Sequence, residues 1–165
     1  MGESSLELFA ELAIGLIGFA GVVSALGRSR LSVETVSFRF RALLTNGITA
    51  LVFSILPLVL AAHGVSAKIL WTVATVLLGI SQICMMIWAA RSVQPISQEE
   101  IPIALRNTMF TLMAIAVLYE AYGTIFQPDS LSGVYLVGLS ASFGLGLFHF
   151  CLLVLAVRTT NESTI

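Results

Sequence analysis

Two glutamates lie within long apolar stretches of this 165-residue sequence, Glu11 in the first stretch and Glu120 in the fourth. An acidic side chain inside a bilayer is costly, and it is usually retained for ion passage, proton relay or a buried partner. We expect both acids at similar depths below one membrane surface, because the first stretch should run inward and the fourth outward. If their helices meet, within one chain or between subunits, the two carboxyl groups would share a proton or recruit a cation.

The alternative is that each glutamate bonds separately to a backbone group, a Tyr or Thr side chain or a lipid headgroup. The histidines bear on this choice. His63 is expected at the outer end of the second stretch, where it could be a pH-sensitive partner of the acids. His149 is expected about two turns from the inner end of the fifth stretch. A proton path could then run from the acids, through Ser142 or Thr75, to His149.

A metal or haem cofactor is not predicted. His149 and Cys151 point about 200° apart on a helix, so one soft metal ion cannot take both as ligands. The two cysteines, Cys84 and Cys151, show no metal-finger spacing. The two histidines are expected at opposite depths, where they cannot hold one haem iron between them. A bound lipid remains an alternative.

Small and polar residues recur at helical spacing in every apolar stretch. Helices in lipid pack through such residues, because lipid tails provide no hydrophobic force between apolar helices. Packing seams alone would explain the stripes, and the alternative is that some of them line a hydrophilic path. The residues predicted for this pore or packing stripe are Gly15, Gly18, Asn46, Ser54, Thr75, Gln82, Ser142 and Gly146.

The elements that must position these residues are membrane helices. The chain is 58% hydrophobic and 10% charged, whereas soluble domains are about 25% charged. Because about 20 apolar residues span a bilayer, the sequence predicts an all-α integral membrane protein with one domain, residues 1–165. Its five transmembrane helices are expected at about 6–26, 42–62, 69–90, 103–126 and 131–157.

Basic residues favour the cytoplasmic side of a membrane, and seven of the eight fall on one side of the predicted bundle. We therefore predict an external N-terminus and a cytoplasmic C-terminus. Lys68 is the exception. The seven are Arg28, Arg30, Arg39, Arg41, Arg91, Arg106 and Arg158.

Three local features complete the prediction. The segment 32–40 is expected to lie along the membrane surface with its arginines at the headgroups. The run from Ser97 to Glu100 has the pattern of a capping box for the fourth helix. Pro57 lacks an N–H group and frees the carbonyl of Phe53, which Ser54 could help to satisfy.

These observations favour a small oligomeric channel or carrier for protons or cations. The alternative is an accessory subunit that binds a lipid, a hydrophobic ligand or partner helices without transporting anything. The sequence contains no phosphate loop, HExxH motif or catalytic triad at a common depth, so enzyme activity is unsupported. It also lacks the basic cluster of a nucleic-acid-binding protein. We expect a homo-oligomer in a plasma membrane, specifically a bacterial inner membrane.

Overall fold

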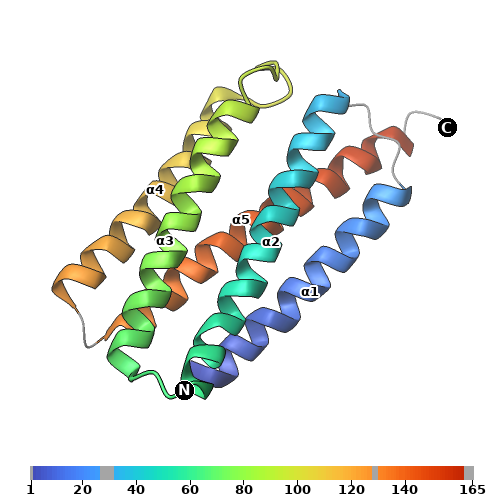
Figure 1. Ribbon diagram of the computed structural model, residues 1–165. Coiled ribbons are helices and arrows are strands. Elements are labelled where there is room, and N and C mark those ends of the chain that lie inside the picture. Colours follow the sequence, from blue (N-terminus) through green and yellow to red (C-terminus); the bar gives the residue numbers. More distant parts are fainter. Residues whose placement is uncertain (1, 27–31, 128–129, 162–165) are drawn as a thin grey trace.

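Five α-helices make up nearly all of the computed structural model, which describes residues 2–26, 32–127 and 130–161 (Figure 1). Each contains a segment that is long and apolar enough to cross a membrane. The prediction of an all-α chain with five such helices is therefore confirmed. The helices are α1 (Gly2–Leu26), α2 (Val33–Ala62), α3 (Ala67–Ser92), α4 (Ile103–Phe126) and α5 (Leu131–Asn161).

Helix α5 is the centre of the bundle. Helices α1 to α4 follow one another across the molecule, and α5 crosses behind them (Figure 1). It contacts all four, whereas α1 contacts only α2 and α5, and α4 contacts only α3 and α5, among the residues described. Gly146 permits one of these approaches, because a Cβ atom there would lie 3.2 Å from the Cβ atom of Asn46 on α2.

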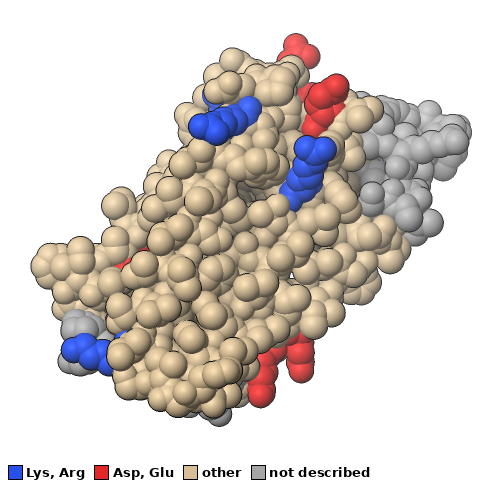
Figure 2. Space-filling view, viewed as in Figure 1, with Lys and Arg blue, Asp and Glu red and all other residues tan. Residues whose placement is uncertain are grey.

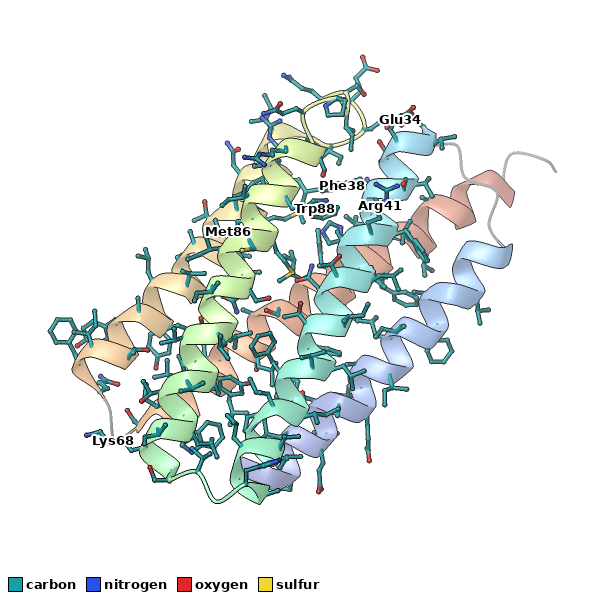
Figure 3. The ribbon with its side chains drawn as sticks, in the orientation of Figure 1. Glu34, Phe38, Arg41, Lys68, Met86 and Trp88 are labelled. Carbon is teal, nitrogen blue, oxygen red and sulfur yellow. The ribbon has the colours of Figure 1, made fainter. Side chains whose placement is uncertain are left out.

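Charge gathers mainly at two opposite ends of the molecule, and the surface between them is largely apolar (Figure 2). Arg39, Arg41, Arg91 and Arg106 lie towards the end at which α2 and α4 begin and α3 finishes. Lys68 lies at the opposite end (Figure 3). An apolar flank between two charged ends is the surface expected of a protein that crosses a bilayer. The other three arginines of the predicted set lie where the side chains are not described.

Helix α2 begins at Val33 and not near residue 42, so the prediction that residues 32–40 lie along the membrane surface is wrong. Ser32 caps the helix by accepting a hydrogen bond from the backbone N–H of Thr35. Its own backbone N–H and hydroxyl donate to the Glu100 carboxylate at 3.0 and 2.6 Å, and the Thr35 hydroxyl donates to the same group. A carboxylate is favoured at a helix N-terminus, where backbone N–H groups lack partners.

The prediction of a capping box for the fourth helix is also wrong. Glu100 binds the start of α2, and the N-cap residue of α4 is Pro102, which makes no side-chain capping bond. Arg39 also holds this segment in place, and its side chain is only 7% exposed. Its guanidinium donates to the backbone carbonyls of Glu100 at 3.2 Å and Leu152 at 3.3 Å.

Aromatic packing closes the same end. The rings of Phe38 and Trp88 stack with their centroids 5.9 Å apart (Figure 3). Three apolar side chains of the segment between α3 and α4 pack against Phe38, namely Val93, Ile96 and Ile101. The segment 93–102 is therefore folded onto the first turns of α2.

The carbonyl that Pro57 leaves free is satisfied from another helix. The hydroxyl of Tyr135 on α5 donates to the carbonyl of Phe53. The hydroxyl of Ser54 donates instead to the carbonyl of Ala50, at 2.6 Å. Tyr135 therefore provides the polar link that the sequence assigned in part to Ser54.

We predict that Tyr135→Phe lowers the free energy of unfolding by about 1 kcal/mol, the usual scale for a hydrogen bond between membrane helices. The variant keeps the ring, which lies 5.6 Å from the ring of Trp71, and removes only the donor. The measurement is unfolding by SDS titration in mixed micelles. Tyr122→Phe is the matched control, because Tyr122 is 50% exposed.

A second substitution tests the cause. Pro57→Ala restores an N–H group four residues after Phe53, so the loss caused by Tyr135→Phe should shrink in the double variant. Equal losses in the presence and absence of Pro57 would contradict the assigned bond.

We also predict a pH-dependent contribution from Glu100. The Ser32 hydroxyl, the Thr35 hydroxyl and the Ser32 N–H hold the pKa of Glu100 below its ordinary value. The resulting stability is fully present above the pKa of the unfolded chain, about 4.3. It is lost as the pH falls through the lower pKa of the folded protein. Glu100→Gln should therefore lower the thermal midpoint near neutral pH, and the difference from wild type should vanish in acid.

The matched control is Glu99→Gln, because Glu99 is an exposed neighbour of Glu100. A wild-type advantage over Glu100→Gln that does not shrink as the pH falls below the unfolded-chain pKa of about 4.3 would refute the assignment.

Candidate functional site

A buried polar cluster joins α3, α4 and α5 midway along the bundle. We call Gln82, Glu120, Gly138 and Ser142 the Glu120 cluster. The three side chains are 0–2% exposed. The amide nitrogen of Gln82 lies 3.1 Å from Oε1 of Glu120, 3.0 Å from the carbonyl oxygen of Gly138 and 3.2 Å from the hydroxyl of Ser142. Because an amide nitrogen carries two hydrogens, these three oxygens compete for two donors.

Two glycines make room for the carboxyl group. A Cβ atom at Gly138 on α5 would lie 1.5 Å from Oε1 of Glu120, and one at Gly79 on α3 would lie 3.0 Å from Oε2. The first distance is far below any van der Waals contact. The side chain of Glu120 therefore occupies space that any larger residue at position 138 would fill.

The carboxyl group is incompletely satisfied. Gln82 is its hydrogen-bond donor, and Oε2 of Glu120 has no partner among the residues described. Glu120 also borders a groove of about 290 Å³ between α3 and α4, whose other walls include Val76, Ile80 and Val117. Buried polar groups nearly always find partners, so an unpaired carboxyl oxygen beside a groove marks a candidate binding site.

Glu11 does not join this cluster within one chain. Its side chain is exposed on α1, and α1 makes no contact with α4 in the part of the chain described. The expectation that the two acids could meet is wrong for the single chain. Helix α1 packs on α2 and α5, whereas α4 packs on α3 and α5. His63 is also separate, since it is the exposed C-cap residue of α2 and its Nδ1 lies 2.8 Å from the carbonyl oxygen of Val59.

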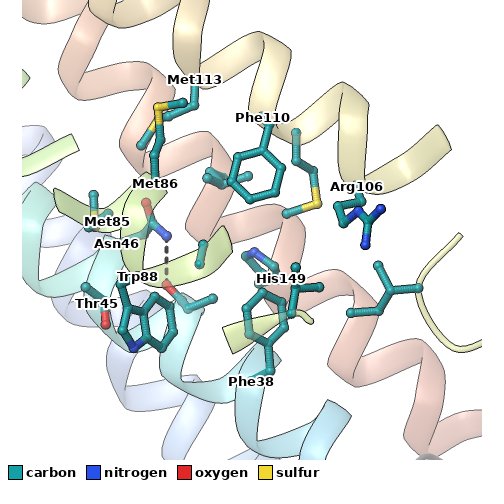
Figure 4. Close-up of a pocket in the computed structure, with 16 residues that line it drawn as sticks. Phe38, Thr45, Asn46, Met85, Met86, Trp88, Arg106, Phe110, Met113 and His149 are labelled. Carbon is teal, nitrogen blue, oxygen red and sulfur yellow. Dashed lines mark hydrogen bonds between the residues drawn. The ribbon is translucent and has the colours of Figure 1, made fainter. Parts of the chain in front are cut away.

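His149 and Asn46 border a second cavity, of about 50 Å³, towards the end that holds the arginines (Figure 4). His149 is 3% exposed, and its ring makes edge contacts with Phe38 and Phe148 at 5.8 and 6.2 Å. Nδ1 of His149 and Oδ1 of Asn46 have no hydrogen-bond partner among the described residues. Four methionines, among them Met86, and the rings of Phe38, Trp88 and Phe110 form part of the wall. The cavity has the volume for one or two water molecules, at about 30 Å³ each.

Of the other predicted stripe residues, Gly146 packs against Asn46, and the rest bond within their own helices or face open space. The hydroxyl of Thr75 donates to the carbonyl of Trp71, one turn earlier on its own helix. A Cβ atom at Gly15 or Gly18 would meet nothing within 4 Å. Of the predicted stripe, Gln82 and Ser142 lie with Glu120, and Asn46 lies with His149.

No model of a known protein family matches this chain, and no curated protein and no solved structure shows significant similarity to it. Within the described residues, no group of three or more His, Cys, Asp or Glu side chains is placed to hold a metal ion.

We predict that Gly138→Ala destabilises the protein by about 1–3 kcal/mol, the usual cost of overpacking a core. The added methyl group would displace the Glu120 carboxyl group and break its bond to Gln82. Unfolding by SDS titration measures the effect.

Gly133→Ala is the matched control on the same helix, because a Cβ atom there meets nothing within 4 Å. Since alanine favours a helix over glycine, this control should be neutral or stabilising. Equal stability of the two variants would show that the carboxyl group does not occupy the assigned space.

Proposed function

We propose that the protein is a small channel or carrier for protons or cations, and that Glu120 is its ion-binding group. The observation that carries this proposal is a carboxyl group that is 2% exposed, with one oxygen unpaired among the described residues, within a helix apolar enough to span a membrane. Ionisable groups at such positions commonly mark ion and proton pathways. A group that served packing alone would need no unpaired oxygen.

The polar residues of α5 support a route from this site. Ser142 and His149 are seven residues apart, which places them on one face of the helix about 10 Å apart along its axis. Asn46 lies beside His149 at the same cavity. Glu120, Ser142 and His149 thus form successive polar stations towards the end with the arginines. Glu11 and His63 lie outside this route within the single chain.

The charge distribution supports an orientation. With the arginine-rich end in the cytoplasm, the N-terminus lies outside and the C-terminus inside, in a plasma membrane such as a bacterial inner membrane. The open faces at Gly15 and Gly18 support a homo-oligomer, because small residues allow close approach of helices in lipid.

A second function is favoured by a different surface. A groove of about 720 Å³ runs between α4 and α5, and its walls are almost wholly apolar, including Leu112, Ile115, Val137 and Phe148. Such a groove suits a lipid tail or another hydrophobic ligand. Under this alternative the protein is an accessory or ligand-binding subunit, and Glu120 is a hydrogen-bond anchor.

Flux through purified protein separates the two functions. We expect liposomes that contain the wild-type protein and an internal pH dye to respond to an imposed proton, K⁺ or Na⁺ gradient. Glu120→Gln should reduce the flux to that of empty liposomes, because the amide cannot exchange a proton or pair with a cation. The substitution keeps an oxygen that can accept from Gln82, so assembly should be preserved.

Glu11→Gln is the matched control, since Glu11 is an exposed glutamate outside the cluster. It should leave the flux of a correctly folded protein unchanged. Flux in Glu120→Gln equal to that of wild type would remove Glu120 from the mechanism. No flux from folded wild-type protein under any of the gradients would favour the accessory function.

A further inference from the structure

The groove between α3 and α4 offers Glu120 an approach from the side of the bundle. We propose that this groove binds a lipophilic organic cation with one positive charge, which pairs with the Glu120 carboxylate in exchange for a proton. The inference rests on the proposed ion-binding role of Glu120, and it specifies the substrate class of that site.

The polar atoms at the groove are acceptors. The hydroxyl of Thr75 donates its proton to the carbonyl of Trp71 at 2.7 Å, and that of Thr124 donates to the backbone carbonyl of Glu120 at 2.8 Å. Both threonines border the groove beside Glu120. With their protons committed, the threonines can offer only oxygen lone pairs. A groove bordered by a buried carboxyl group and two threonine hydroxyl oxygens complements a cation and repels an anion.

The remaining walls argue for an organic body around that charge. They are formed mainly by aliphatic side chains such as Ile80, Ile83 and Ile125. A bare or hydrated inorganic ion would leave water for a surface that returns almost no polar contacts, which is costly. A quaternary ammonium ion carries its charge inside an apolar shell and has no N–H group to satisfy, so it fits both features.

The volume is consistent with a small ligand. The groove holds about 290 Å³, close to the lower limit of about 300 Å³ for ligand sites. It is too small for a phospholipid, whereas a benzyl group with a trimethylammonium head can be accommodated.

The exchange balances in charge and atoms. The O–H bond of the Glu120 carboxyl group breaks, its proton leaves to water, and the cation takes its place beside the carboxylate. One proton is therefore released for each cation bound. Binding should weaken as the pH falls, because protons compete with the cation for the same group.

The test uses the purified full chain in a neutral detergent, with benzyltrimethylammonium as the probe. Equilibrium dialysis measures binding, and a pH indicator in weakly buffered solution measures proton release. We expect saturable binding, one proton released per cation, and loss of both in Glu120→Gln. Neopentylbenzene, the uncharged carbon analogue of the probe, should not compete.

A second pair of variants tests the groove without changing the carboxyl group. Ala121 is exposed and borders the groove, so Ala121→Phe should weaken binding at least roughly tenfold by filling it, a loss of about 1.4 kcal/mol. Ala90→Phe is the matched control, because Ala90 is an exposed alanine of α3 away from this groove. It should bind the probe like wild type.

Two results would overturn the inference, namely probe binding that survives Glu120→Gln, or equal binding of the uncharged analogue. Either would make the groove a plain apolar surface. Proton flux that depends on Glu120, together with no probe binding, would also reject the inference and leave the proposed transport intact. Binding that depends on Glu120, without flux under a proton, K⁺, Na⁺ or benzyltrimethylammonium gradient, would support the inference and reject the transport.

Discussion

Lipid offers no hydrogen-bond partners, so polar groups buried in a bundle of apolar helices must bond to other groups of the protein or to enclosed water. Most of the helix-to-helix solutions involve α5. Its Tyr135 satisfies the carbonyl that Pro57 frees on α2, its Gly138 carbonyl accepts from Gln82 on α3, and its Leu152 carbonyl accepts from Arg39 on α2. These three bonds lie at successive depths along one helix. Helix–helix association therefore relies on α5, which also contacts each of the other four helices.

The same constraint identifies the places where the protein departs from it. Five side-chain atoms are buried without partners among the described residues. Two of them are Nε of Arg39 and Oε1 of Gln82. The other three are Oε2 of Glu120 on α4, Nδ1 of His149 on α5 and Oδ1 of Asn46 on α2. All three residues border a cavity or a groove, so space for a ligand or water adjoins each unpaired group. An incomplete polar network weakens packing. For Glu120, His149 and Asn46, a ligand or water in the adjoining space would satisfy the atom that the fold leaves unpaired.

The sequence predicted the positions of the helices better than the contacts between them. Hydropathy alone placed the fourth helix at 103–126, which coincides with α4. The start of α2 was missed because Arg39 was taken as a headgroup ligand, whereas two backbone carbonyls allow it to be buried. Equal depth brought Glu11 and Glu120 together in the prediction, but depth does not determine which helices touch. Likewise, the spacing of Gly138 showed a small-residue stripe, and only the fold shows that the space beside it holds a carboxyl group.

The two ends of the polar route are not equivalent. At the arginine-rich end, the segment 93–102 is fixed to α2 by Glu100 and Arg39, and it covers the ring of Phe38, which contacts His149. A species that moved along the bundle axis would have to displace this packing. Glu120, in contrast, is buried beside a groove on the flank of α3 and α4. The shorter way to the carboxyl group is therefore sideways through the apolar flank, and that direction selects for molecules that already dissolve in lipid.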